Sequence, residues 1–140
     1  TLKELVIMKC IDECVDCFDN DLNKLDLDVD ISKVTNLIVT VIFDFFVNSL
    51  VSQKLILGYT INPPLNSKCI HKLGSTIEKT YERNIDINNV FNKAGVCRVI
   101  AQIILSIFSL NTKESGALND VGKIEAIRAA SAYLESWIKK

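Results

Sequence analysis

A run of apolar residues from 95 to 110 constrains the fold of this chain more than any other feature. Its only charged side chain is Arg98, close to the start of the run. A helix built on these residues is apolar on every face, so we expect it to be buried rather than to lie at a surface. At roughly 15 residues it is also short for a membrane span. The run predicts a helix at the centre of a helical domain, with an arginine at its entrance that stays protonated and needs a carboxylate or water.

The composition is typical of one compact helical domain. Of the 140 residues, 49% are hydrophobic, and the chain holds only two prolines and five glycines, so it is long enough to bury a core. The net charge of −1 argues against binding of nucleic acid, which needs a basic face. Five cysteines, an odd number, and the lack of a recognisable signal peptide favour a reduced, intracellular compartment. A membrane enters the interpretation only through an anchor that would follow Lys140.

Hydrophobic periodicity and breaks divide the chain into two parts. Residues 1–30 read as an N-terminal helix, over about 2–18, and an acidic linker, and residues 31–140 as a helical domain that completes one compact unit. We expect the helices of that domain to span residues 32–57, 67–85, 95–110 and 121–138, the last of them capped by Asp120. The apolar face of the first of these helices is too wide for one packing partner. It is therefore either deeply buried or offers a second face to another protein, and we expect a homodimer.

Three cysteines near the N-terminus have the spacing of a metal site, C-x-x-x-C-x-x-C. Cys10, Cys14 and Cys17 match the pattern of radical-SAM iron–sulfur enzymes. The same spacing places them on one face of a helix, where free cysteines pack as small hydrophobic residues. A zinc site would need a fourth ligand, and the only histidine, His71, is far away in sequence. We expect a structural role and no metal or cofactor, with a small helical metal-binding protein kept as an alternative.

Neither a calcium loop nor a catalytic motif is complete in this chain. Residues 19–23 begin like a calcium-binding loop, but Lys24 stands where the turn needs glycine and Asp30 replaces the bidentate glutamate. The sequence has no glycine-rich phosphate loop and no nucleophile elbow, and a single histidine leaves few options for general base chemistry. We therefore expect that the protein is not an enzyme and that His71 lies at the surface.

The helix expected over residues 70–83 resembles the third homology motif of the Bcl-2 family of apoptosis regulators. The positions that match are Ile70, Gly74, Ile77 and Tyr81. Ser75 replaces the acid of the motif. Glycine at position 74 has a physical sense, because it permits a close approach of two helices that any side chain would block.

Other segments resemble the remaining motifs of that family, in the family's order. They are residues 43–54 for the fourth motif, 95–98 for the first and 133–138 for the second. Of the first motif only Arg98 is kept, and Ser136 replaces the proline of the second. The resemblance covers residues 34–140, and its divergence is typical of a virus-encoded member.

The resemblance implies a Bcl-2-like helical bundle around a buried central helix, with a hydrophobic groove for an amphipathic helix. That helix would be the death motif of a pro-apoptotic Bcl-2 protein, and an aspartate in it would pair with Arg98. Ala101 would allow a close approach of helices, and for Ile77, Val99 and Ile100 a place in the core is the alternative. The implied walls of the groove are Ile77, Tyr81, Ile85, Val90, Phe91, Val99, Ile100 and Ala101.

The resemblance implies an inhibitor of apoptosis that sequesters pro-death helices in the cytoplasm, or at the mitochondrial outer membrane, of a host cell. The alternative with the same fold is a viral adaptor that blocks innate immune signalling without binding a peptide. A pro-death member of the family is a third reading. A preformed groove with an accessible Arg98 would favour the inhibitor, and a closed groove would favour the adaptor.

Overall fold

Helices are the only regular elements in the described part of the chain, which comprises residues 2–21, 30–58 and 66–138 of the computed structural model. In chain order they are α1 (Leu2–Asp21), α2 (Ile31–Val47), α3 (Leu50–Ser52), the π-helical turn η1 (Gln53–Leu57), α4 (Ser67–Asn84), α5 (Lys93–Ser115) and α6 (Asp120–Ile138). The prediction of an all-α fold is confirmed. Most of the acidic linker predicted before residue 31 lies outside the described residues.

Short polar side chains cap the starts of α2, α4 and α6. Asp30 accepts a hydrogen bond from the backbone N–H of Lys33 at 2.8 Å, and Asn66 accepts one from Cys69 at 3.0 Å, as N-cap residues do. The last helix begins in a different way from the prediction, because Asn119 and not Asp120 accepts the hydrogen bond, from the N–H of Val121 at 3.0 Å.

The prediction of a single helix over residues 32–57 is wrong. Helix α2 ends at Val47, and the chain turns by 97° before α3 and η1 continue it. A new helix, α3, begins after Ser49, because the backbone of this residue is extended and its side chain accepts a hydrogen bond from the N–H of Ser52 at 3.3 Å. Asn48 closes the preceding helix with its N–H on the carbonyl of Asp44. Two consecutive capping residues therefore interrupt an apolar pattern that is otherwise continuous.

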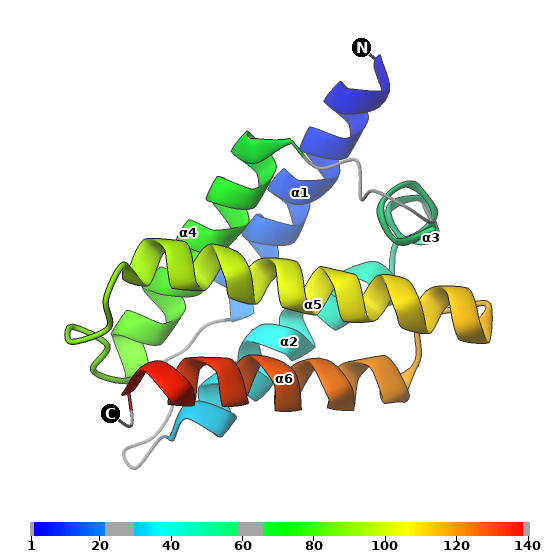
Figure 1. Ribbon diagram of the computed structural model, residues 1–140. Helices are drawn as coiled ribbons and strands as arrows, with labels where there is room; N and C mark the ends of the chain where they lie inside the picture. The colour runs from blue at the N-terminus through cyan, green and yellow to red at the C-terminus, as the bar shows by residue number, and fades with distance from the viewer. Residues whose placement is uncertain (1, 22–29, 59–65, 139–140) are drawn as a thin grey trace.

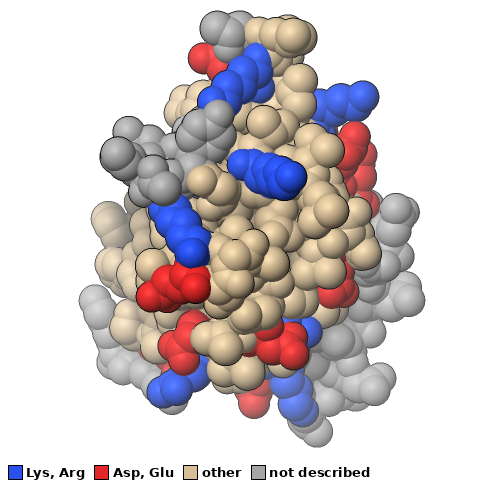
Figure 2. Space-filling model, turned by 90° about the vertical axis from the view of Figure 1, so that its right-hand side faces the viewer, with Lys and Arg blue, Asp and Glu red and all other residues tan. Residues whose placement is uncertain are grey.

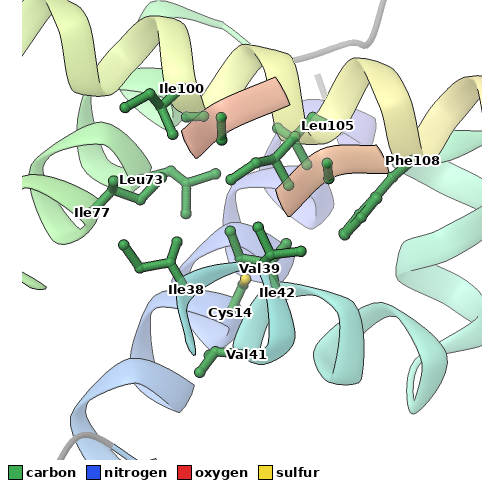
Figure 3. Packing of buried hydrophobic residues seen from close by; sticks show 14 of the residues in the cluster. Cys14, Ile38, Val39, Val41, Ile42, Leu73, Ile77, Ile100, Leu105 and Phe108 are labelled. Atoms are coloured by element: carbon green, nitrogen blue, oxygen red, sulfur yellow. The ribbon is translucent and has the colours of Figure 1, made fainter. Parts of the chain in front are cut away.

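The wide apolar face of α2 is explained by burial inside the chain. The helix runs behind α6 and also packs against α1 and α4 (Figure 1). Its buried residues are Val34, Thr35, Ile38, Val39, Val41, Ile42, Phe43, Phe45 and Phe46. Figure 3 shows side chains of α1, α2, α4 and α5 pointing toward one another in this core, with Cys14 beside Ile42. A second protein is not needed to cover this face.

Helix α5 is longer than the predicted helix over residues 95–110, and it is less buried than we expect from the sequence. It crosses the front of the molecule in Figure 1, antiparallel to α6. The expectation of burial on every side is wrong, because an exposed stripe runs along α5 through Val99, Gln102, Ser106 and Leu110. The Nε2 of Gln102 donates to the hydroxyl of Ser106 at 2.9 Å on this stripe. Two polar residues one turn apart mark the face that solvent reaches.

By length and composition alone, α5 is apolar enough to cross a membrane, and so is α2 when it is joined to the bent segment after it. Half of the apolar window of α5 is buried within the protein, a property that the core helices of soluble proteins share. The criterion is therefore weak evidence for a membrane span.

The N-terminal helix is part of the same core. Ile7, Ile11, Cys14 and Phe18 of α1 are each at most 1% exposed and pack against the other helices. An ion pair between Lys72 of α4 and Asp12 of α1 joins the two helices at the surface. Residues 2–21 thus pack into the bundle that the following helices form.

Candidate functional site

A cavity of about 440 Å³ opens between the first turns of α5 and the last turns of α6. These two helix ends lie side by side at the left of Figure 1. The residues that line the cavity are Phe91, Asn92, Gly95, Val96, Arg98, Val99, Gln102, Tyr133 and Trp137. The walls are mostly apolar and aromatic, with one positive charge, as in sites that hold a side chain or a small ligand.

Asn92 and Gly95 build the entrance of this cavity. Asn92 has a φ of 52°, in the left-handed region that asparagine tolerates. Its Oδ1 accepts a hydrogen bond from the N–H of Gly95 at 3.4 Å and so begins α5. A Cβ atom on Gly95 would lie 2.2 Å from the Nδ2 of Asn92, so any larger residue there displaces the Asn92 side chain from its capping position.

Two aromatic residues stand at the mouth of the cavity. The rings of Phe91 and Trp137 stack with their centroids 6.5 Å apart and their planes at 26°. Phe91 is 76% exposed, so most of this ring faces solvent. An exposed phenyl ring beside an apolar cavity supplies a surface that a partner can cover.

Arg98 is held against α4 by its aliphatic stem. A Cβ atom on Gly74 would lie 2.7 Å from the Cγ of Arg98 and 3.1 Å from its Cα, so only glycine permits this approach. Within the described residues the guanidinium forms no hydrogen bond and no ion pair. The residue is half-buried and lines the cavity. The stem of Arg98 is therefore held against α4, and the charge at its end is available to an anionic group.

The structure brings together some of the predicted groove residues and separates the others. Arg98, Phe91 and Val99 meet at the cavity. Ile77, Tyr81, Ile100 and Ala101 are 0% exposed, and Val90 is 7% exposed, so these five belong to the core. Ile85 borders another cavity, of about 410 Å³, together with Asp86 and Glu135.

Direct contact of α4 with α5 is the physical reason for this division. The approach of the two helices at Gly74 and Arg98 leaves the apolar side chains between them without access to solvent. Tyr81 is one of these, and its hydroxyl shares a hydrogen bond of 2.6 Å with Thr35 of α2. Burial raises the pKa of Tyr81 well above its usual range. This tyrosine is a polar link within the core rather than part of a groove.

The predicted site residues leave out six that line the cavity: Asn92, Gly95, Val96, Gln102, Tyr133 and Trp137. Tyr133 and Trp137 are four residues apart and so share a face of α6. That spacing indicates a shared aromatic face, and it lies in the segment 133–138 that resembles a family motif. The other missing information was the pairing of α6 with α5, which no local pattern contains.

The cysteine spacing describes a packed face. Cys10 and Cys14 are buried in the core and Cys17 is half-buried. Burial raises the pKa of the Cys97 thiol to about 12, and it raises that of Cys14 even further. In the described part of the chain, no three histidine, cysteine or acidic residues are grouped to hold a metal. His71 is exposed, as predicted.

Charges of both signs are interspersed on the face that Figure 2 shows, which lies at the end of the molecule away from the cavity.

Comparison of the chain with protein-family models, with curated proteins and with solved structures gave no match. The resemblance to the Bcl-2 family therefore depends on the sequence motifs alone, and the helical architecture is what the structure adds.

Proposed function

We propose that this protein binds an amphipathic helix that carries an acidic residue, and that it acts as a Bcl-2-like inhibitor of apoptosis by holding the death-motif helix of a pro-apoptotic partner. The observation that carries the proposal is Arg98, a cation whose stem packs on α4 at the edge of an apolar cavity of about 440 Å³. A helix with apolar residues on one face and an aspartate beside them fits this combination.

The exposed stripe of α5 extends the surface beyond the cavity. Val99 lines the cavity and is 42% exposed, and Leu110 at the far end of the stripe is 56% exposed. A partner helix that lies along α5 would cover these residues together with Phe91. Burial of apolar surface on this stripe would supply affinity, and the arginine would fix the register of the partner.

A charge-assisted pair between Arg98 and a partner aspartate is worth about 1.5–3 kcal/mol. We therefore expect Arg98→Ala to weaken binding by at least tenfold, since each 1.4 kcal/mol corresponds to about one decade in Kd. Isothermal titration against a panel of synthetic death-motif peptides measures this difference. Arg128→Ala, on an exposed arginine of α6 outside the cavity, is the matched control.

Two results would change the proposal in different ways. Binding that is the same in wild type and Arg98→Ala would remove the salt bridge and leave another mode of helix binding. The absence of binding to every peptide of the panel would remove the survival function and favour the second candidate below.

The second candidate is an adaptor of innate immune signalling with the same kind of fold. The observation that favours it is the packing of α4 directly on α5, with no space for a ligand between the two helices at Gly74. The residues that a family groove would expose at this interface are buried in the core. A functional assay of signalling in transfected cells, compared with an assay of cell death, separates the two candidates.

A further inference from the structure

The contact between α4 and α5 is bordered by four charged residues. Gly74 lies against Arg98, and two turns later Glu82 of α4 pairs with Lys93 of α5, with 3.5 Å between Oε2 and Nζ. These two contacts fix an antiparallel register of the helices. Glu78 lies midway between Gly74 and Glu82, four residues from each, and so shares the face of α4 that looks toward the start of α5.

The groups around Glu78 shift the pKa of its carboxyl in opposite directions. Burial raises the pKa of its carboxyl, and a hydrogen bond and like charge from Glu82 raise it further, whereas Lys93 and Arg98 lower it. The charge on Glu78 also contributes to the raised pKa of the buried Cys97 thiol of α5. The carboxylates of Asp12 and Asp16 in α1 raise the pKa of Lys72, at the other end of α4, and do not contribute to the shift of Glu78.

We propose that Glu78 is the internal counter-charge of Arg98, and that an acidic partner helix has to share the guanidinium with it when it binds. The inference rests on the proposed function, since it needs an acidic partner at Arg98. It assigns Glu78 a role in affinity and in selectivity, because a partner carboxylate at Arg98 would lie near a second negative charge that the protein itself supplies.

Proton uptake on binding is the consequence that can be measured. A partner carboxylate at Arg98 weakens the attraction that keeps Glu78 charged and adds a like charge, so the pKa of Glu78 rises and its protonated fraction is larger in the complex than in the free protein. Affinity then rises as the pH falls from neutral toward the raised pKa of Glu78. The rise ends near pH 4, where the partner's own carboxylate is protonated.

The first test uses the full chain and a death-motif peptide that binds. Titration calorimetry at one pH in two buffers of different ionisation enthalpy gives the number of protons taken up. We expect uptake for wild type and none for Glu78→Gln, which binds about two- to fivefold more tightly at neutral pH, as expected for the loss of one partly screened repulsion. Glu125→Gln on the exposed face of α6 removes the same charge and should behave as wild type.

The second test needs no partner. A carbon-13 NMR titration of the Glu78 carboxyl in the free protein should show a higher pKa in Arg98→Gln than in wild type. An unchanged titration in that variant overturns the inference. Peptide binding without proton uptake overturns it as well and leaves the proposed function intact, whereas failure of every peptide to bind removes both.

Discussion

Gly74 of α4 lies so close to Arg98 of α5 that a Cβ atom on it would be 2.7 Å from the Cγ of the arginine and 3.1 Å from its Cα. The second distance involves backbone, which cannot move aside as a side chain can. We expect Gly74→Ala to destabilise the protein, because overpacking costs about 1–3 kcal/mol, against a gain of about 1 kcal/mol in helix propensity. Urea unfolding measures the difference. Ser75→Ala, at the next and exposed position, should leave stability unchanged or slightly higher.

Burial of the Tyr81 hydroxyl, which shares a hydrogen bond with Thr35, predicts a loss of stability at alkaline pH. Both residues are at most 1% exposed, so Tyr81→Phe leaves the Thr35 hydroxyl without this partner, at a cost of about 1–2 kcal/mol at neutral pH. The pKa of Tyr81 is raised in the folded protein, so the native state holds its proton where the unfolded chain releases it. The contribution is full below about pH 10 and falls as the pH rises above it.

Urea unfolding between pH 8 and pH 11 checks this sign. The free energy of unfolding should fall more steeply with pH in wild type than in Tyr81→Phe, and Tyr133→Phe on α6 is the matched control. Parallel pH profiles for wild type and Tyr81→Phe would contradict the assignment of the buried phenol.

Gln53 joins three parts of the chain and predicts a large effect of one substitution. Its Nε2 donates to the carbonyl of Phe46 at 3.2 Å, and its Oε1 accepts from the N–H of Leu118 at 3.2 Å. The residue is 7% exposed, so Gln53→Leu leaves the N–H of Leu118 without this partner and removes one of the hydrogen bonds to the Phe46 carbonyl, which still accepts from Ser49, at a cost of roughly 1–3 kcal/mol. Hydrogen exchange at Leu118 should also accelerate.

The exposed Gln102 offers the control for this experiment. Gln102→Leu on the open stripe of α5 should change the free energy of unfolding by less than about 0.5 kcal/mol. Equal stability of the two leucine variants would show that the bend after α2 does not depend on Gln53.

Much of the fold follows from local signals. The predicted helices over residues 67–85 and 121–138 agree with α4 and α6 to one residue. The interpretation of Gly74 as a point of close approach is confirmed by its contact with Arg98. Each of these depends on neighbours within a few residues, or on a residue type whose small size has one main use.

The break at Asn48 and Ser49 shows where periodicity misled the prediction. Apolar residues continue at helical spacing on both sides of the bend, so the pattern alone favours one helix. Two short polar residues in a row were the available sign, since both compete for backbone hydrogen bonds and favour the ends of helices.

The candidate site was predictable only in part, and Ile77 shows why. Its place on the apolar face of α4 follows from the sequence. Whether that face meets a helix of the same chain or a partner's helix does not, because both satisfy the same hydrophobic pattern. Phe91 illustrates the converse, since only the stacking on Trp137 shows that this ring stands at a cavity.

By itself, the sequence determined that the chain is helical, where α4 and α6 begin and end to within one residue, and that one arginine stands at the start of an apolar helix. The tertiary structure decided which apolar faces are covered from within. It closed α4 on α5, left a stripe of α5 open, and placed the aromatic residues of α6 beside Arg98. The physical reason is that burial depends on contacts between residues far apart in the chain, whereas helix formation and capping depend on neighbours.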